Sequence, residues 1–357
     1  MTSDPTTWKG LPAFSGTGIG SVPFLSVEKA CAEILRHERL IPFWPQMVGV
    51  DAREDMLFQF SPPLPCLKPD WEEKVLTLDP DCPRPEILAY FYEKFLEADP
   101  GYFALHPDYA SGFYALLQAT VDRPTPFLKG QIVGPVTLGL SVRSAGDRFL
   151  IHEPELFDAV IKGLAAQALD QVYQFQAAGR KALIFIDEPS LSGYGSAFTP
   201  LTRPEVLSIL GELIGLIREK ADVLLGLHCC GNTDWNLLLA LDLDIINLDA
   251  FDYGEAFVLY PREIRSFLEG DRAVAWGLVP TTAFTGKETP EFLLARLRGY
   301  FETLIGRGVD RERLLRQSLL TPACGLGTLS ENTAAVLLDL LNQTCRRAPE
   351  YFRIPGN

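Results

Sequence analysis

The feature that most constrains the fold is a repeated alternation of short apolar runs and longer amphipathic segments, separated by polar, glycine or proline breaks. The apolar runs predict strands at residues 17–23, 41–47, 127–138, 182–187, 222–228, 244–249, 273–279 and 318–321. Segments of helical period fall between them, at residues 27–39, 86–97, 153–178, 204–220, 233–241, 261–268, 290–305 and 331–346. Because parallel neighbouring strands need helical crossovers, this order predicts an α/β fold with a parallel sheet.

Eight strands with about eight helices match the (β/α)8 TIM barrel, and barrels of this length are commonly one domain. We therefore expect a single catalytic barrel over residues 1–357, with a doubly wound open sheet as the alternative. Residues 61–85 contain seven prolines, which exclude a regular helix and a central strand. We expect this segment to be an excursion between the second and third strands, formed by a surface loop with a hairpin. A substrate lid is the less favoured alternative.

Charge excludes several classes of partner. The chain has 46 acidic and 32 basic residues, a formal net charge of −14, so it lacks the electrostatic footprint of nucleic-acid binding and is repelled by anionic membranes. Residues 1–10 show no signal-peptide pattern, and no apolar run approaches the 18 or so residues of a membrane span. We expect a cytoplasmic protein with no nucleic-acid or membrane partner, in which the seven cysteines are reduced.

A histidine and two cysteines follow predicted strands at the ends where barrel enzymes place their catalytic groups. His228 and Cys230 share one face of the fifth strand because residues i and i+2 point the same way, whereas Cys229 points away. Cys324 lies in a glycine-flanked turn after the eighth strand. Imidazole and thiolates are ligands that zinc prefers, so the pattern indicates a metal centre, with buried core cysteines as the alternative. The cysteines that we interpret as structural are Cys31, Cys66, Cys82 and Cys345.

Two further strand ends carry polar groups suited to a small substrate. Asp187 and Glu188 end the fourth strand, and only one of them can face the pocket. Asp187 is favoured because Pro189 begins to turn the chain, while Glu188 has a helix cap or a salt bridge as its alternative. Residues 18–21, Gly-Ile-Gly-Ser, are too short for a dinucleotide fingerprint. They offer unhindered backbone N–H groups and a hydroxyl, which suit a carboxylate.

These motifs, in chain order, resemble cobalamin-independent methionine synthase, and more narrowly its C-terminal catalytic barrel. The motifs are Ile19-Gly20-Ser21, Gly134-Pro135-Val136-Thr137, Ile186-Asp187-Glu188-Pro189, His228-x-Cys230-Gly231-Asn232 and Cys324-Gly325. The wider superfamily also contains corrinoid-dependent thiol methyltransferases and uroporphyrinogen decarboxylase. The amino-terminal barrel of the long synthases has no counterpart, so the resemblance implies a stand-alone catalytic barrel.

The resemblance implies a zinc cofactor held by His228, Cys230 and Cys324, with Asp249 near the place of the family's glutamate ligand. The residues that it assigns to the substrate site are Ile19, Gly20, Ser21, Asp187 and Glu188. The first three of these would hold the carboxylate of homocysteine. Asp187 would be the catalytic-site carboxylate that holds its amine.

Two departures from the family pattern concern the methyl donor. The synthases follow the Gly-Pro-Val-Thr motif with a tryptophan on which the folate stacks, whereas this chain has Leu138. The second carboxylate that reads the homocysteine amine, in a His-Gly-Glu stretch, is also missing. The sequence therefore favours a methylated corrinoid, usually delivered on a protein partner, over a folate. Trp44, Trp276 and Phe284 are the alternative platforms that could restore a pterin site.

The resulting expectation is a zinc-dependent methyltransferase that transfers a methyl group to a small thiol, homocysteine, to form methionine. One alternative is a corrinoid-dependent methyltransferase acting on another thiol such as coenzyme M. A uroporphyrinogen decarboxylase-like lyase is another, but it needs a basic pocket and no arginine pair follows the first strand. A metal-binding barrel without turnover would not need the amino-acid pocket.

Overall fold

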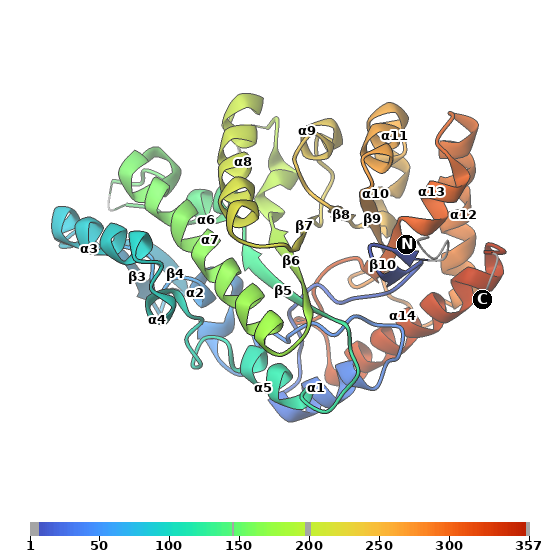
Figure 1. Ribbon diagram of the computed structural model, residues 1–357, viewed down its shortest axis with the longest axis horizontal. Coiled ribbons are helices and arrows are strands. Elements are labelled where there is room, and N and C mark those ends of the chain that lie inside the picture. Colours follow the sequence, from blue (N-terminus) through green and yellow to red (C-terminus); the bar gives the residue numbers. More distant parts are fainter. Residues whose placement is uncertain (1–6, 145, 197–200, 355–357) are drawn as a thin grey trace.

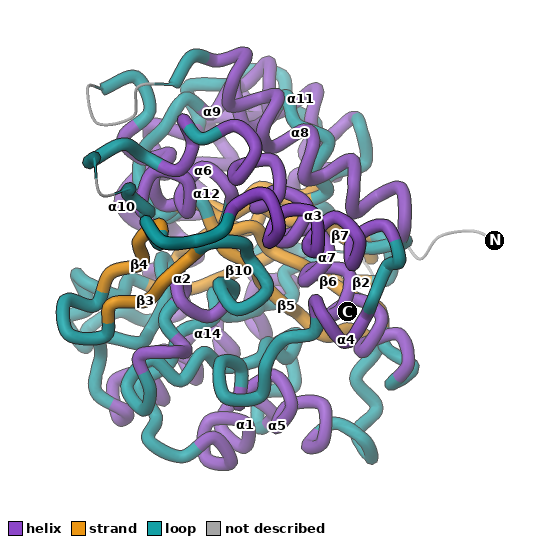
Figure 2. The backbone as a smooth tube through the Cα atoms, turned by 90° about the vertical axis from the view of Figure 1, so that its left-hand side faces the viewer, coloured by secondary structure: helices purple, strands orange, loops and turns teal. Residues whose placement is uncertain are grey.

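A curled sheet of six parallel strands lies at the centre of the computed structural model, which describes residues 7–144, 146–196 and 201–354. The strands stand in the order β10-β9-β8-β7-β6-β5, so neighbours in space are also neighbours along the chain. They are β5 (Phe127–Val133), β6 (Lys181–Asp187), β7 (Leu224–Cys229), β8 (Ile245–Leu248), β9 (Ala273–Val279) and β10 (Ser318–Pro322). Figure 2 shows these strands at the centre of the molecule with helices around them.

The helices connect the strands and cover the outer face of the sheet (Figure 1). The first seven are α1 (Val27–Leu35), α2 (Met56–Gln59), α3 (Arg84–Leu96), α4 (Pro100–Phe103), α5 (Ser111–Ala119), α6 (Pro135–Ser141) and α7 (Pro154–Ala177). The others are α8 (Arg203–Lys220), α9 (Trp235–Leu239), α10 (Ala250–Phe257), α11 (Pro261–Glu269), α12 (Pro290–Gly306), α13 (Arg311–Arg316) and α14 (Glu331–Tyr351). Short 3-10 turns occur at Ala52–Glu54, Leu150–His152 and Pro189–Gly193.

Local sequence explains where several helices begin. Thr202 and Glu205 form a reciprocal capping box at the start of α8, and the Thr289 hydroxyl accepts a hydrogen bond from the backbone N–H of Phe292 in α12. Such caps satisfy backbone donors that the first helical turn cannot pair internally. In α8 and α12 a proline stands in the first turn, where its missing N–H costs nothing.

Two of the eight expected strands are not strands in the structure. Residues 17–23 and 41–47 take part in isolated parallel bridges instead. The bridges within these segments join Ser21 to Gln46 and Phe43 to Lys129. Just before the segments, Gly16 is bridged to Leu40 and to Leu320. Pro42 and Pro45 cannot donate to a ladder, which explains why the pairing is broken. Because the bridges reach both β10 and β5, the two segments lie between the edge strands of the sheet. The sheet is therefore a six-stranded curled half-barrel where the sequence pattern predicts eight strands.

The predicted strand at residues 127–138 is too long. β5 ends at Val133, and α6 begins at Pro135 after the N-cap Gly134. The apolar run continues from β5 into α6 because β5 and the first five residues of α6 are buried, so hydrophobicity alone does not mark the boundary. The Gly-Pro pair does mark it, since proline fits the first turn of a helix and ends a ladder.

The proline-rich excursion at residues 61–85 contains an antiparallel hairpin, as expected, made of β3 (Leu67–Asp70) and β4 (Val75–Leu78). A disulfide between Cys66 and Cys82 closes its base. This pair differs from the expectation that all cysteines are reduced. Thr77 of the hairpin also forms a parallel bridge with Arg143, just after α6.

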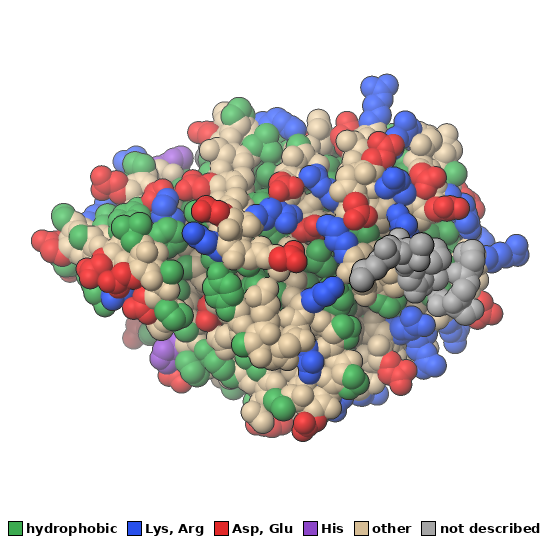
Figure 3. All heavy atoms as spheres, in the orientation of Figure 1, with side chains coloured by type: hydrophobic (Ala, Val, Ile, Leu, Met, Phe, Trp, Pro, Cys, Tyr) green, Lys and Arg blue, Asp and Glu red, His purple; other side chains and the backbone are tan. Residues whose placement is uncertain are grey.

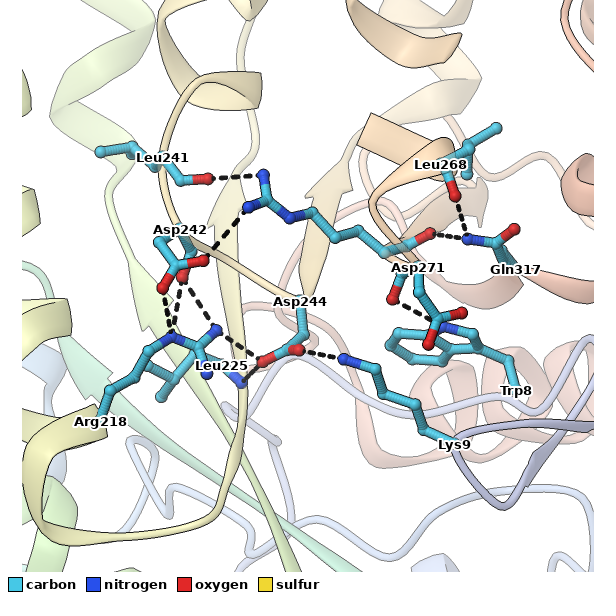
Figure 4. Close-up of polar contacts among 11 residues, drawn as sticks. Trp8, Lys9, Arg218, Leu225, Leu241, Asp242, Asp244, Leu268, Asp271 and Gln317 are labelled. Carbon is cyan, nitrogen blue, oxygen red and sulfur yellow. Dashed lines mark hydrogen bonds and ion pairs between the residues drawn. The ribbon is translucent and has the colours of Figure 1, made fainter. Parts of the chain in front are cut away.

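The amino-terminal ends of the strands are closed by the hairpin of β1 (Thr7–Trp8) and β2 (Leu11–Pro12). The apolar side chains of this part of the interior are Trp8, Leu11, Ile41, Phe127, Leu183, Phe185, Ile245, Ala273, Ala275 and Leu319. Figure 4 shows the polar contacts that fasten the hairpin. Asp244 accepts hydrogen bonds from Lys9 at 2.5 Å and Arg218 at 2.8 Å, and the Trp8 indole donates to the Asp271 carbonyl at 3.0 Å.

On the face seen in Figure 3, basic and acidic side chains are interspersed over the helices. Both signs of charge therefore occur close together on this face. No helix in the described ranges combines the length and the apolar character that crossing a bilayer requires.

Candidate metal and substrate site

Three potential metal ligands predicted from strand ends come together in the structure. His228 lies in β7, Cys230 directly follows that strand, and Cys324 follows β10. One ligand atom from each lies within 4.8 Å of the other two. Cys229 is fully buried in the outer core layer, as the alternation along the strand predicts. No other group of three histidine, cysteine or acidic side chains with metal-ligand spacing occurs among the described residues.

The two thiols of this group shift each other's pKa in opposite directions. The hydrogen bond between them lowers the pKa of Cys324 and raises the pKa of Cys230. Burial opposes ionisation of Cys324, while the nearby His228 ring favours it. The first thiolate therefore forms at Cys324. Both cysteines are free of disulfides and only partly buried, whereas the free thiol of Cys229 is fully buried.

The side chain of His228 is held by the neighbouring strand. Its Nδ1 lies 2.5 Å from Oδ1 of Asn247, the residue paired with it on the neighbouring strand β8. Its other ring nitrogen, Nε2, is buried and has no hydrogen-bond partner among the described residues. A buried nitrogen without a partner is rare in folded proteins, and here it belongs to a residue of the group that contains the two sulfurs.

Asp249 follows β8 and lies outside the group of three. Its Oδ1 accepts a hydrogen bond of 2.9 Å from the backbone N–H of Asp252, so it caps α10. Burial raises the pKa of Asp249 to about 6, and the charge of Cys324 contributes to this rise. The carboxyl group is therefore within electrostatic reach of the Cys324 sulfur.

Asp187 ends β6 directly beside His228, with which it is paired in the sheet. Its side chain is buried, and its Oδ1 has no hydrogen-bond partner among the described residues. Burial raises the pKa of Asp187 to about 6, while the charge of Lys129 opposes the rise. A buried carboxylate oxygen without a donor is costly, so this oxygen is suited to receive a donor from a ligand.

Lys129 of β5 is a buried cation that the sequence reasoning missed. Its side chain is inaccessible to solvent, and its Nζ donates to the Ile19 carbonyl and to Oε1 of Gln131. The Nζ also lies 4.8 Å from the centre of the Phe185 ring. Burial lowers the pKa of Lys129 to about 8, and the charge of Asp187 opposes this shift. Lys129 therefore holds the Ile19 carbonyl by a hydrogen bond, and its positive charge favours the ionised form of Asp187.

Glu188 turns away from Asp187 and caps α6. Its carboxylate accepts hydrogen bonds from the backbone N–H groups of Val136 at 2.9 Å and Thr137 at 2.8 Å, and from the Thr137 hydroxyl at 2.7 Å. Burial raises the pKa of Glu188 to about 7, although these donors oppose the shift. A Cβ at Gly134 would lie 2.1 Å from the Glu188 carboxyl carbon, so only glycine allows this approach.

The segment Ile19-Gly20-Ser21 lies beside the turn that carries Cys324. The backbone N–H of Leu326 donates to the Ser21 carbonyl at 2.9 Å, and that of Gly327 donates to the Ser21 hydroxyl at 3.3 Å. Within the described ranges, the N–H groups of residues 19–21 themselves donate to no protein acceptor. The three N–H groups are therefore free to bind an anion.

Two glycines allow the turn that carries Cys324 to approach its neighbours. A Cβ at Gly325 would lie 2.2 Å from the Ser21 hydroxyl oxygen. At Gly277 of β9 a Cβ would lie 2.4 Å from the Leu248 carbonyl oxygen and 3.0 Å from the Ala323 Cα. Both positions need glycine because backbone or side-chain atoms already occupy the space that a Cβ would fill.

Two of the three aromatic residues considered as pterin platforms are buried in the core of the fold. Trp44 is fully buried, donates from Nε1 to Gln171 of α7, and packs edge-on against Phe113 of α5. Trp276 of β9 is also fully buried and packs among aromatic rings of α10 and α12. Both side chains thus belong to the layer between sheet and helices. Phe284, in the loop after β9, is only partly buried.

Comparison with solved structures finds a similar fold. A B12-independent methionine synthase from Shewanella sp. W3-18-1, in complex with selenomethionine, is 19% identical, with a TM-score of 0.50 over 68% of this chain and 67% of that chain. A GH113 β-mannanase, AaManA from Alicyclobacillus acidocaldarius in complex with ManMIm, is 12% identical, with a TM-score of 0.27 over 66% of this chain and 91% of that chain. The second likeness is too weak to carry an argument. No protein-family model and no curated protein matches the chain.

The first likeness confirms, at the level of the fold, the resemblance that the sequence motifs indicate. This chain is similar to a B12-independent methionine synthase. At 19% identity the likeness concerns the fold, and the chemistry of the site has to be argued from its own residues.

Proposed function

We propose that this protein is a zinc-dependent methyltransferase that transfers a methyl group to the thiol of homocysteine and forms methionine. The proposal is carried by the convergence of His228, Cys230 and Cys324 beside Asp187, whose Oδ1 is buried without a partner among the described residues. Three soft ligands favour a metal that activates sulfur, and a buried carboxylate beside them favours a substrate with an ammonium group. A purely structural metal site would not need that charge. The likeness in fold to a methionine synthase supports the same reaction class.

The donor set fits zinc. One imidazole nitrogen and two thiolates are the ligands zinc prefers, whereas calcium and magnesium take oxygen ligands. Zinc at this position would lower the pKa of a substrate thiol and hold it as a thiolate. His228 would bind through Nε2, and Cys230 and Cys324 through their sulfurs. Asp249 is proposed as the fourth ligand through the oxygen that does not cap α10, which would keep the site anionic and the substrate sulfur nucleophilic.

The substrate pocket is proposed to hold an amino-acid thiol by both of its charged ends. Asp187 would accept hydrogen bonds from the substrate ammonium through Oδ1. The free N–H groups of Ile19, Gly20 and Ser21, with the Ser21 hydroxyl, would hold the carboxylate. Glu188 would shape the pocket through α6. A thiol such as coenzyme M has no ammonium group, so a free Asp187 oxygen favours homocysteine.

The methyl donor is proposed to be a methylated corrinoid, on a protein partner or free, in preference to a methyl-folate. A pterin would need an aromatic plane, and Trp44 and Trp276 are buried in the outer layer of the fold. Phe284 is the remaining aromatic of those considered. We further propose that residues 17–23 and 41–47, through their isolated bridges, close the six-stranded sheet into a barrel and that residues 1–357 form one catalytic domain.

Metal content tests the first part of the proposal. The purified chain should hold about one zinc ion, because a site of this type binds a single ion. Cys230→Ala should lose most of it, whereas the matched variant Cys229→Ala should keep it because that side chain lies in the outer core. Equal zinc content in both variants would contradict the proposed ligand set.

Methyl transfer tests the second part. The zinc-loaded protein is incubated with homocysteine and either methylcobalamin or methyl-folate, and methionine is measured. We expect faster turnover with methylcobalamin. Robust turnover with methyl-folate alone would contradict the proposed donor and direct attention to Phe284, and absence of methionine with both donors would contradict the proposed reaction.

A further inference from the structure

Asn247 of β8 is fully buried inside the sheet, and the orientation of its side-chain amide is fixed. Its Nδ2 donates to the Ala275 carbonyl at 2.8 Å and to the Thr321 hydroxyl oxygen at 2.8 Å, and its Oδ1 lies 2.5 Å from Nδ1 of His228. A carbonyl oxygen can only accept, so the NH2 group has to face Ala275. Reversing the amide would set two oxygens against each other there, and the choice between the two orientations is therefore determined.

This orientation determines where the His228 ring carries its hydrogen. The Oδ1 of an amide is an acceptor only, so His228 Nδ1 has to be the donor. In a neutral imidazole with its hydrogen on Nδ1, the lone pair is on Nε2. That atom is buried without a partner among the described residues. Because Nδ1 is engaged by Asn247, Nε2 is the ring nitrogen left to act with the sulfurs of Cys230 and Cys324.

We propose that Asn247 is a positioning residue that fixes the His228 tautomer, so that Nε2 is presented as a metal ligand. The same amide also donates to the hydroxyl of Thr321, which belongs to β10, the strand that leads into Cys324. One amide thus joins the strand of the histidine ligand to the strand of a cysteine ligand. The identity of the metal rests on the proposed function, but the tautomer is a property of the metal-free chain. Partners of this kind affect metal affinity by about 10- to 100-fold.

The tautomer can be measured without metal or substrate. Nitrogen-15 NMR spectra of the metal-free full-length chain at pH 8, well above the ordinary imidazole pKa of about 6.5, distinguish protonated from unprotonated ring nitrogens. The chain has four histidines, so the spectrum of His228→Gln assigns the signal. We expect hydrogen on Nδ1 and none on Nε2. Hydrogen on Nε2 in the wild type would overturn the proposal whatever the variants do.

Three variants separate the tautomer from general stability. Asn247→Leu removes the acceptor and should lose the preference for Nδ1–H, with zinc affinity about 10- to 100-fold weaker in competition with a chelator. Asn247→Asp keeps an acceptor for Nδ1–H and should keep hydrogen on Nδ1, although one of its oxygens then faces the Ala275 carbonyl. Thr321→Val removes only the far partner of the amide and should also keep it, although it perturbs the same core.

The outcomes distinguish this inference from the proposed function. If Asn247→Leu binds zinc as tightly as the wild type, or if Thr321→Val weakens binding equally, Asn247 has no specific positioning role. Suppose that the wild type shows the expected tautomer and that Asn247→Leu weakens zinc binding, but that the wild type transfers no methyl group. This result would support the inference and contradict only the proposed reaction.

Discussion

Replacing Gly277 by alanine should displace the strand ends that position the metal ligands. The added Cβ would lie 2.4 Å from the Leu248 carbonyl oxygen, where ordinary contacts begin at 3.4 Å, so a gap of 3.4 − 2.4 = 1.0 Å has to open. It would also lie 3.0 Å from the Ala323 Cα and 3.1 Å from the Pro322 carbonyl oxygen. All three neighbours are backbone atoms, which cannot move aside by changing rotamer. The displacement therefore falls on the end of β8, the end of β10, or both.

Metal–ligand distances tolerate only about 0.2 Å, so a backbone shift near 1 Å should weaken zinc binding by at least the ~10- to 100-fold typical of outer-shell changes. Overpacking of this kind should also lower the free energy of unfolding by about 1–3 kcal/mol. The weaker zinc binding and the lower stability have the same steric cause, because the strand ends that pack around Gly277 also lead into the proposed metal ligands.

The assay is chelator competition for zinc, combined with urea unfolding of the metal-free protein. The matched control is Gly299→Ala in α12, where an added Cβ meets no atom within 4 Å; it should raise stability by roughly 0.5–1 kcal/mol and leave zinc binding unchanged. Wild-type zinc affinity in Gly277→Ala would refute the reasoning, since it would mean that the Cys324 turn does not depend on this close approach.

Asp187→Asn should weaken homocysteine binding by about 1.5–3 kcal/mol, or roughly 10- to 150-fold in KM, because a charge-assisted hydrogen bond becomes a neutral one; equal loss of zinc would instead assign Asp187 to the metal. Burial raises the pKa of Asp244, but hydrogen bonds from Lys9, Leu225 and Arg218 outweigh this and the net pKa is lowered below the ordinary 3.8. The stability that this carboxylate contributes is therefore present above the unfolded pKa and is lost as pH falls through the folded pKa. Asp244→Asn should be less stable than the wild type at pH 7 by about 1–3 kcal/mol. Urea unfolding should show that this difference in the free energy of unfolding becomes smaller toward pH 3. A difference that does not change with pH would contradict the assignment. Reducing the Cys66–Cys82 disulfide, whose cysteines are 16 residues apart, should lower the free energy of unfolding by up to ~3 kcal/mol without loss of zinc, as denaturant titration with and without reductant would measure.

The part of the site that lies at strand ends could be predicted from sequence. His228 and Cys230 share a face because strand side chains alternate, and Cys324 comes near them because the ends of parallel strands meet at one edge. These rules need only the position of each strand end. They do not need the register between strands, which explains why the ligand group was accessible to reasoning without a structure.

The polar residues inside the strands could not be predicted in the same way. Lys129 and Asn247 stand within short, otherwise apolar runs, and nothing in those runs tells which face is internal or what lies opposite. The contact between Asn247 and His228 depends on the register of β7 with β8, and that of Lys129 with Ile19 depends on a segment without regular strand pairing. The proline breaks in that segment also explain why two predicted strands form only isolated bridges. The spacing of Cys66 and Cys82 likewise gave no sign of a disulfide, because pairing depends on the hairpin between them.

The proposed carboxylate site and the proposed metal site are held together through Ser21. Its carbonyl and hydroxyl accept hydrogen bonds from the backbone of Leu326 and Gly327, directly after the turn that carries Cys324. Asp187 and the metal ligand His228 are likewise neighbours in one sheet register. The groups proposed to bind the two charged ends of the substrate are therefore each fixed to an element that carries a metal ligand. Binding the amino-acid end would then set the position of the thiol, and contacts remote from sulfur would affect the rate of methyl transfer as well as affinity.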